Sequence, residues 1–228
     1  YAYTNELYYK LTNAFSPGPL TVILPKKQTV PDAVTGGLDT VAIRIPSDNI
    51  ASAIIEYAGV AVAAPSANTS GKPSPTEAVH VIEALNGKAD MIIDGGASEI
   101  GLESTVVKVT ENEVVLLRPG AVDVQMLKVV CENVTVSPAI LEKLKTGEKA
   151  ESPGMMYKHY APSTPLVLLD GTPEDVLAFL QKEQADRSCA ILCYFEEMPH
   201  LKHENLFPVG GKDDLTTQAH TLFSLLRE

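Results

Sequence analysis

The stretch AVAAPSANTSGKPSPT, residues 61–76, is the part of the chain around which we expect the fold to be organised. The run of small apolar residues at 60–64 predicts a buried strand, which Pro65 ends. Residues 75–85 have the pattern of a helix, with Ser74 placed to be its N-cap. α/β proteins use this order of strand, polar loop and helix N-terminus to present backbone N–H groups to an anion.

The loop at 66–74 carries more polar side chains than a turn requires. Capping a helix uses only one such group, so the other Ser, Thr and Asn residues favour a cradle for a phosphate or a carboxylate. The loop lacks the Gly/Lys pattern of a Walker loop. An ordinary strand-to-helix turn is the alternative interpretation.

The composition indicates one large or two small domains with an aliphatic core, since 45% of the 228 residues are hydrophobic and only 6% are aromatic. The formal net charge of −11 argues against general affinity for nucleic acids or anionic membranes. The three cysteines are typical of reduced thiols. With no apolar run of membrane-spanning length and no signal-peptide pattern, we expect a cytoplasmic location. Because residue 1 is not Met and a helical pattern begins almost at once, we expect the chain to begin partway into a domain.

Helical and strand patterns are mixed through the first two thirds of the chain. We expect helices at 6–15, 47–57, 75–85, 123–130 and 138–144, and strands at 20–24, 41–45, 60–64, 91–93, 104–109, 114–117 and 134–136. The strands at 104–109 and 114–117 flank a polar turn and predict an antiparallel hairpin. Together these elements predict an α/β fold.

The last third starts a new pattern after an unusual connecting segment. Strands at 166–169 and 189–194 and helices at 172–183 and 216–227 predict a small parallel-sheet domain. The preceding SPGMMYKHYAP, residues 152–162, is rich in Met, Tyr and His for a passive tether. It is either an ordered linker docked by its aromatic residues or a lid over the pocket of the first domain.

Two arginines stand out in this acidic chain because each lies in or at the end of a strand pattern. Arg44 lies between apolar neighbours, and Arg118 precedes a sharp Pro-Gly turn. Arg44 either belongs to a solvated face or lines the same cavity as the polar loop and clamps a carboxylate. Ser104 enters the hairpin, where its hydroxyl either satisfies free backbone groups or contributes to the site. Together these residues suggest a local anion site rather than a basic surface. We predict no protein-held metal, since His200 and His203 lack a partner cysteine.

Six short motifs occur in the order found in one known family. They are PGPLT at 17–21, VAIRIP at 41–46, APSANTSG at 64–71 with SPT at 74–76, ESTVV at 103–107, LLRPG at 116–120 and SPGMMYKHYAP at 152–162. Together they resemble the two-domain Sua5 form of the YrdC/Sua5 threonylcarbamoyl-AMP synthases. Each motif alone is weak, but six in order are specific, and the resemblance is close over about residues 10–165.

The resemblance implies a YrdC-like twisted mixed sheet with helices at 1–146, a connecting segment at 147–164, and a small Rossmann-like parallel α/β domain at 165–228. It implies an enzyme that makes threonylcarbamoyl-AMP and pyrophosphate from L-threonine, bicarbonate and ATP, with Mg²⁺ on the phosphates. The product would supply the machinery that transfers the threonylcarbamoyl group to adenosine 37 of tRNA. Neither membrane association nor strong direct nucleic-acid binding is implied.

The resemblance also implies ligand contacts. Those for ATP are Thr40, Ser66, Asn68, Ser74, Arg118 and Tyr160, with Tyr157 as the less favoured tyrosine. Those for L-threonine are Arg44, Ala64 and Ser104. The tyrosine would reach over the nucleotide as the connecting segment closes.

Some features depart from the family pattern. The family's N-terminal segment with its K-x-R lysine and arginine is absent, Ser16 stands where the family commonly has Trp, and the C-terminal domain lacks its last portion. We therefore expect this chain to be part of the enzyme and not to catalyse alone. The alternative is a non-catalytic YrdC-like module that binds nucleotide or double-stranded RNA, although a net charge of −11 argues against RNA. A second rival, a hydrogenase-maturation carbamoyl-transfer enzyme with an embedded YrdC-like domain, fits HYAP and the following domain less well.

Overall fold

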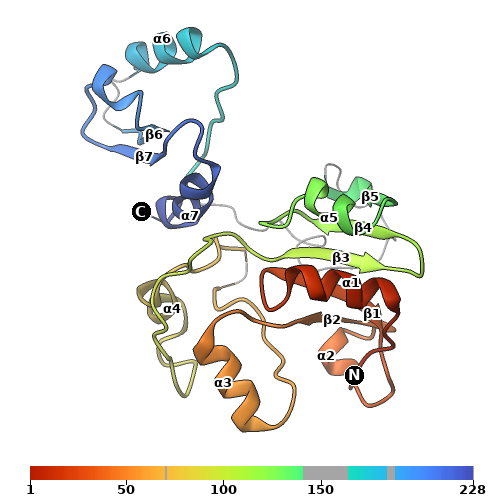
Figure 1. The fold of residues 1–228 in the computed structure, drawn as a ribbon. Helices are drawn as coiled ribbons and strands as arrows, with labels where there is room; N and C mark the ends of the chain where they lie inside the picture. The colour runs from red at the N-terminus through yellow and green to blue at the C-terminus, as the bar shows by residue number, and fades with distance from the viewer. Residues whose placement is uncertain (70, 141–163, 184–187, 228) are drawn as a thin grey trace. The chain divides into compact units, whose positions relative to one another are not determined.

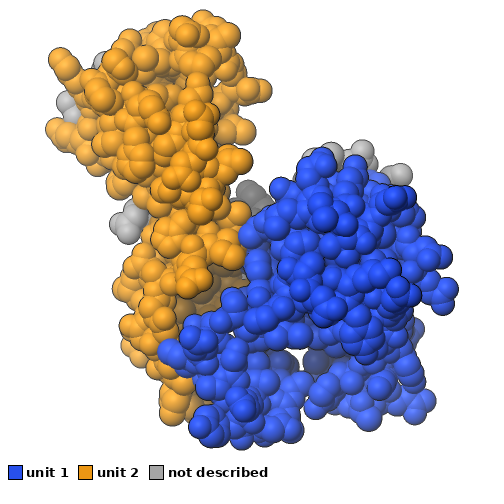
Figure 2. All heavy atoms as spheres, in the orientation of Figure 1, with its two compact units in different colours: residues 1–65, 103–158 blue, residues 66–102, 159–228 orange. Residues whose placement is uncertain are grey.

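The computed structural model describes residues 1–69, 71–140, 164–183 and 188–227, and Figure 1 shows their helices and strands. Two compact units divide the chain (Figure 2). The first is Tyr1–Pro65 with Glu103–Lys158, and the second is Ser66–Leu102 with His159–Glu228. The second unit thus combines a segment from the middle of the chain with its C-terminal part.

The first unit is built on a five-stranded mixed sheet with the order β2-β1-β3-β4-β5. The strands are β1 (Leu20–Pro25), β2 (Thr40–Arg44), β3 (Thr105–Val109), β4 (Val114–Arg118) and β5 (Val134–Val136). β1 runs antiparallel to β2 and parallel to β3, while β4 is antiparallel to β3 and parallel to β5. This confirms the hairpin and the mixed sheet that the sequence predicts.

One face of this sheet carries the main core. The helices of the unit are α1 (Glu6–Phe15), α2 (Asp32–Thr35), α3 (Asn49–Ala58), α5 (Val124–Val130) and the 3₁₀ turn η1 (Pro138–Ile140). Asn5 caps α1 by accepting the N–H of Tyr8 at 2.8 Å, so that Leu11 is directed into the core with 0% exposure. Leu127 of α5 joins the same cluster, and Figure 1 shows α1 lying along the sheet.

The second unit contains a two-stranded parallel sheet and three α-helices among its described residues. Its elements are α4 (Ala78–Leu85), α6 (Pro173–Glu183), β6 (Ile191–Tyr194), the 3₁₀ turn η2 (Met198–His200), β7 (Leu206–Gly210) and α7 (Leu215–Leu225). The parallel pairing of β6 with β7 confirms the predicted sheet type, although sequence analysis missed β7 because a proline and a glycine interrupt its pattern. Among the described residues, no helix combines the length and apolar composition that crossing a membrane requires.

Three predicted strands are wrong. Residues 60–64, 91–93 and 166–169 have no strand conformation, and most of their side chains are exposed, with Leu168 at 89%. A strand is stable only where a neighbouring strand takes its N–H and C=O groups, and none of the described strands pairs with these runs. The alanines in the run 60–64 add little stability to a strand, because their small side chains pack weakly on a pleated surface.

The helix after the polar loop starts later than predicted, and Ser74 is not its N-cap. α4 begins at Ala78, and Glu77 occupies the cap position, although its side chain makes no capping hydrogen bond to the helix backbone. The ring of His80 lies back over the start of the helix, where its Nδ1 accepts the N–H of Thr76, the residue before the cap position, at 3.3 Å. The helix predicted from 47 also begins later, at Asn49, and Asp48 caps it. Of the helix predicted at 138–144, the described part is η1.

Leu11→Ala should destabilise the protein strongly, because it leaves a cavity where α1 meets the sheet. The expected loss in free energy of unfolding is about 2–5 kcal/mol, measured by urea denaturation followed by circular dichroism. Val129→Ala is the matched control, since Val129 is 87% exposed on α5 and should change the free energy by about 0.5 kcal/mol or less. Equal losses for the two variants would contradict the position of the core.

Candidate functional site

A row of paired residues crosses the first unit's sheet and brings both arginines to one face. Arg44 on β2 pairs with Thr21 on β1, Thr21 pairs with Val106 on β3, and Val106 pairs with Arg118 on β4. Side chains of directly paired residues point to the same face of a sheet, and neighbours along a strand point to opposite faces. Arg44, Thr21 and Val106 therefore lie on the face opposite to the α1 core. Arg118 lies beyond a bulge in the β3–β4 pairing, and its guanidinium reaches this face by its hydrogen bond to Oγ of Ser104.

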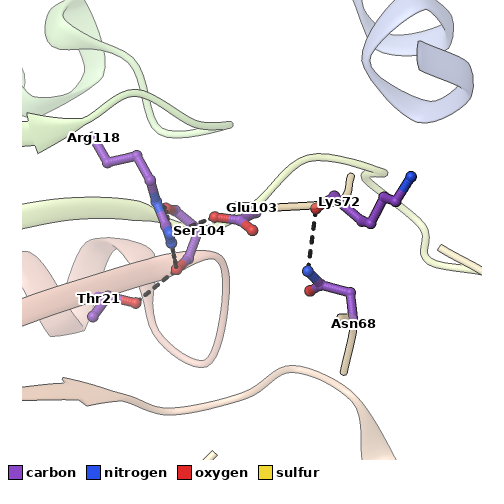
Figure 3. Close-up of polar contacts among 6 residues, drawn as sticks. All are labelled: Thr21, Asn68, Lys72, Glu103, Ser104 and Arg118. Atoms are coloured by element: carbon purple, nitrogen blue, oxygen red, sulfur yellow. Dashed lines mark hydrogen bonds and ion pairs between the residues drawn. The ribbon is translucent and has the colours of Figure 1, made fainter. Parts of the chain in front are cut away.

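Ser104, the residue before β3, lies at the centre of a polar cluster on this face. Its Oγ is 2.7 Å from Oγ1 of Thr21 and accepts a hydrogen bond from Nη2 of Arg118 at 3.0 Å. Arg118 also donates from Nε and Nη2 to the carbonyl of Ser104, at 3.0 and 2.9 Å, and forms an ion pair with Glu103 (Figure 3). The Arg118 and Glu103 side chains are only 19% and 16% exposed. The guanidinium thus fixes both the backbone and the hydroxyl of Ser104.

The neighbouring turn holds this cluster in place from the core side. The buried hydroxyl of Thr105 donates to the carbonyl of Val122 at 2.9 Å and accepts its N–H at 3.0 Å. Gly120 is required between them, because a Cβ there would lie 2.5 Å from the Thr105 nitrogen and 2.6 Å from the Glu103 carbonyl oxygen. The RPG sequence therefore allows the close approach that positions Glu103 and Ser104.

Arg44 is the cation that this face offers to a ligand. It is exposed and forms no ion pair or hydrogen bond with any residue that the structure describes. Its pKa is lowered, first by desolvation from the surrounding protein and then by the positive charge of Arg118. An arginine keeps its charge at neutral pH despite such a shift. Thr40 lies on the same face of β2, four residues before Arg44.

The pair formed by Thr21 and Ser104 has a proton to spare. Their two hydroxyls contribute two protons, and the 2.7 Å contact between them uses one. Whichever hydroxyl donates in that contact, the other proton points elsewhere. Next to Arg44, this face therefore presents a cation and a hydroxyl donor, a combination suited to a carboxylate.

The polar loop belongs to the second unit, and its residues differ in exposure. Ser66 is exposed, whereas Ser74 is only 8% exposed. Nδ2 of Asn68 donates to the carbonyls of Thr69 and Lys72, at 2.9 and 3.1 Å, and so closes the loop on itself (Figure 3). Oδ1 of Asn68 is buried and has no hydrogen-bond partner among the described residues.

The structure brings together Arg44, Ser104 and Arg118 in the first unit, whereas Ser66, Asn68 and Ser74 belong to the second. Ala64 is exposed in the first unit, and Tyr160 and Tyr157 lie outside the described residues. Sequence analysis did not assign Thr21 or Glu103, although both lie in quoted motifs. The signal for Thr21 was its position opposite Arg44, which requires the strand register. That Arg44, Ser104 and Arg118 contact the same ligand as Ser66, Asn68 and Ser74 stays a prediction.

Two family models match the chain. The model of the Sua5, YciO and YrdC proteins, described as "Telomere recombination", matches residues 1–120. The model described as the C-terminal domain of threonylcarbamoyl-AMP synthase matches residues 122–228. Together the two matches extend over nearly the whole chain.

Similar proteins and structures agree with these matches. The threonylcarbamoyl-AMP synthase of Pyrococcus abyssi is 48% identical over 166 residues, which are 73% of this chain and 48% of that protein. That of Bacillus subtilis is 41% identical over 222 residues, 95% of this chain and 62% of that protein. The crystal structure of P. abyssi Sua5 complexed with L-threonine has a TM-score of 0.87 at 39% identity, covering 98% of this chain and 65% of that one. This chain thus spans about half to two thirds of the length of these proteins.

The structural likeness confirms the predicted fold class, an α/β protein with a mixed sheet and a second, smaller α/β part. The first family model accounts for more than half of the residues. The chain therefore belongs to the Sua5/YciO/YrdC family.

Proposed function

We propose that this chain belongs to an enzyme that makes threonylcarbamoyl-AMP and pyrophosphate from L-threonine, bicarbonate and ATP. The observation that carries the proposal is the row across the sheet in which Arg44 lies beside the Thr21, Ser104 and Arg118 cluster. The relatives' names and the L-threonine complex of P. abyssi Sua5 support this reading of the row.

Arg44 is assigned to the carboxylate of L-threonine. A guanidinium binds a carboxylate through two parallel N–H···O bonds, and no described residue competes for it. The spare hydroxyl proton of the Thr21 and Ser104 pair adds a donor next to it. Ala64 would supply a backbone contact to the same amino acid.

Nucleotide contacts are assigned to Thr40, Ser66, Asn68, Ser74, Arg118 and Tyr160. For Arg118 the geometry favours a second role, since its guanidinium already holds Glu103 and Ser104. Among the described residues, no group of three or more His, Cys, Asp or Glu side chains could hold a metal. Mg²⁺ therefore enters the proposal as part of the substrate, bound to ATP phosphates.

The reaction needs positioning and charge neutralisation more than covalent help from the protein. The amine of threonine and bicarbonate condense to a carbamate with loss of water. A carbamate oxygen then attacks the α-phosphate of ATP, and the bond to the β-phosphate breaks, so that pyrophosphate leaves. Arg44 would hold the amino acid by its carboxylate, leaving its amine to react.

The product is a reactive mixed anhydride, which calls for a partner that consumes it. We assign this role to a machinery that transfers the threonylcarbamoyl group to adenosine 37 of tRNA. We assign the protein to the cytoplasm on the basis of this proposed role. The net charge of −11 favours delivery of the small-molecule product over direct tRNA binding by this chain.

The full-length protein should release pyrophosphate from Mg–ATP only when both L-threonine and bicarbonate are present. L-serine should support a rate lower by about tenfold or more, because it lacks one methyl group that a fitted pocket recognises. A coupled phosphate assay with each component omitted in turn measures this. Nucleotide binding without pyrophosphate release would instead support the non-catalytic binding module.

Arg44→Ala should weaken L-threonine binding far more than ATP binding, because the carboxylate loses a bidentate partner worth about 1.5–3 kcal/mol. The dissociation constants of both ligands, measured by calorimetry, check this. Arg44→Lys is the matched variant, since it keeps the charge but not the planar fork, and should recover only part of the affinity. Equal losses for threonine and ATP would refute the assignment.

Ser104→Ala and Thr21→Val should each weaken L-threonine binding by about two- to tenfold, the range for one hydrogen bond. Because the two hydroxyls act as a pair, the double variant should lose less than the product of the single losses. Thr12→Ala is the control, since the Thr12 hydroxyl bonds only carbonyls of its own helix. If the loss of affinity in the double variant equalled the product of the two single losses, the two hydroxyls would bind L-threonine independently of each other or would not bind it.

A further inference from the structure

Helix α7 contacts the end of a segment from the middle of the chain through a glycine that leaves no room for a side chain. Gly101 has a φ of 78°, and a Cβ there would lie 2.4 Å from the carbonyl oxygen of His220 and 2.6 Å from that of Ala219. Beside this contact, Nδ1 of His220 lies 2.9 Å from the carbonyl oxygen of Glu99. Because a carbonyl only accepts, Nδ1 carries the hydrogen.

The same helix contacts the beginning of that segment further along its length. Oγ of Ser224 donates to the carboxylate of Glu77 at 3.2 Å. The guanidinium of Arg227, just after α7, donates to the carbonyl of Pro73. The contacts are thus spread over the helix, and they hold both ends of the segment 73–101.

The two ends of this segment are also joined to each other. The N–H of Ser98 donates to the carbonyl of Thr76 at 2.8 Å. The N–H of Thr76 donates to His80 of α4. Residues 73–77 and 98–101 therefore form one connected patch under α7, and Ser74 lies buried within it.

On its other side, α7 is fixed to the parallel sheet. Oγ1 of Thr221 donates to the carbonyl of Val209 on β7 at 2.5 Å, and Nε2 of Gln218 donates to that of Gly211 at 2.7 Å. The α7 helix therefore links β7 to the segment that directly continues the polar loop at 66–74.

We propose that α7 positions the loop at 66–74 for ATP, with Gly101 and His220 as the positioning residues. The inference rests on the proposed function, since it concerns the placement of Ser66, Asn68 and Ser74. It gives helix α7 a role in nucleotide affinity without any contact of its own with the substrate. If α7 only packed against this segment, disrupting the contact would lower the stability of the protein without a specific effect on ATP affinity.

Gly101→Ala tests the contact against a matched glycine. Gly87 also has a positive φ, 74°, but an added Cβ there would have nothing within 4 Å. Both variants thus share the backbone strain of a side chain at positive φ, and only Gly101→Ala also displaces α7. In the full-length protein without ligand, hydrogen–deuterium exchange should rise at the contact residues 98–101 and in α7 for Gly101→Ala but not for Gly87→Ala.

The same variants should separate in nucleotide binding. Gly101→Ala should raise the dissociation constant of ATP by about tenfold, the size expected for a coupling through packed elements, while that of L-threonine stays unchanged. Gly87→Ala should leave both constants unchanged. His220→Leu should reproduce the loss, and His220→Asn should restore affinity, because the asparagine Nδ2 can donate to Glu99 as the histidine Nδ1 does.

The outcomes distinguish the inference from the function on which it rests. Faster hydrogen–deuterium exchange in residues 98–101 together with an unchanged dissociation constant for ATP would overturn the positioning role. The proposed function would still stand. Unchanged exchange in Gly101→Ala overturns the contact itself. A wild-type protein that binds L-threonine but no ATP overturns the proposed function, and the positioning role with it.

Discussion

The register of β1 is the constraint on which the chemistry of the first unit depends. β1 pairs with β2 on one side and β3 on the other, and Thr21 takes part in both pairings. A slip of one residue would move Thr21 to the core face and break its contact with Ser104. Leu20, Val22 and Leu24 oppose such a slip, because each is only 1% exposed and each contributes about 2 kcal/mol by burial. The apolar face therefore fixes the geometry of the polar one.

Glu103 makes it possible for two arginines to share that polar face. Two like charges near one another would repel, and the lowered pKa of Arg44 records that repulsion after the larger effect of desolvation. The ion pair offsets the charge of Arg118, and the proposed function assigns the ligand to the other cation, Arg44. A partly buried pair of this kind is weak evidence for stability, since its desolvation offsets its attraction. Its clearer effect here is to orient Ser104.

Sequence patterns predicted best where local chemistry and burial agree. The helix at 6–15 was predicted at its observed bounds, since its leucines recur at helical spacing and Asn5 caps it. The hairpin of β3 and β4 was predicted because two short runs rich in β-branched and apolar residues flank a polar turn. By contrast, the apolar run at 60–64 predicted a strand that has no partner among the described residues. Pairing is a property of the whole sheet, which a local pattern cannot report.

The candidate site shows the same difference between residues that a local pattern reveals and residues whose roles depend on the whole sheet. Arg44, Ser104 and Arg118 could be chosen from the sequence, because charged or hydroxyl residues at strand ends are conspicuous among aliphatic ones. Thr21 and Glu103 could not, because a threonine in a strand and an acidic residue in a loop are ordinary. Their roles depend on the register and on the close approach at Gly120. The cap assigned to Ser74 failed because the helix begins only at Ala78, with Glu77 at the cap position.

Under the proposed assignment, Arg44 is the residue that makes this face favour an anion. Its pKa is lowered by desolvation and then by the charge of Arg118, although its side chain is still exposed. In the proposed complex, a carboxylate at Arg44 would offset the repulsion between the two arginines and displace water from the exposed guanidinium. The Thr21 and Ser104 hydroxyls are already held by each other and by Arg118. The entropic cost of ordering groups on binding would therefore come mainly from the ligand. In the proposed function such a face would bind by preorganisation, and its selectivity would depend on the distance between the cation and the hydroxyl pair rather than on charge alone.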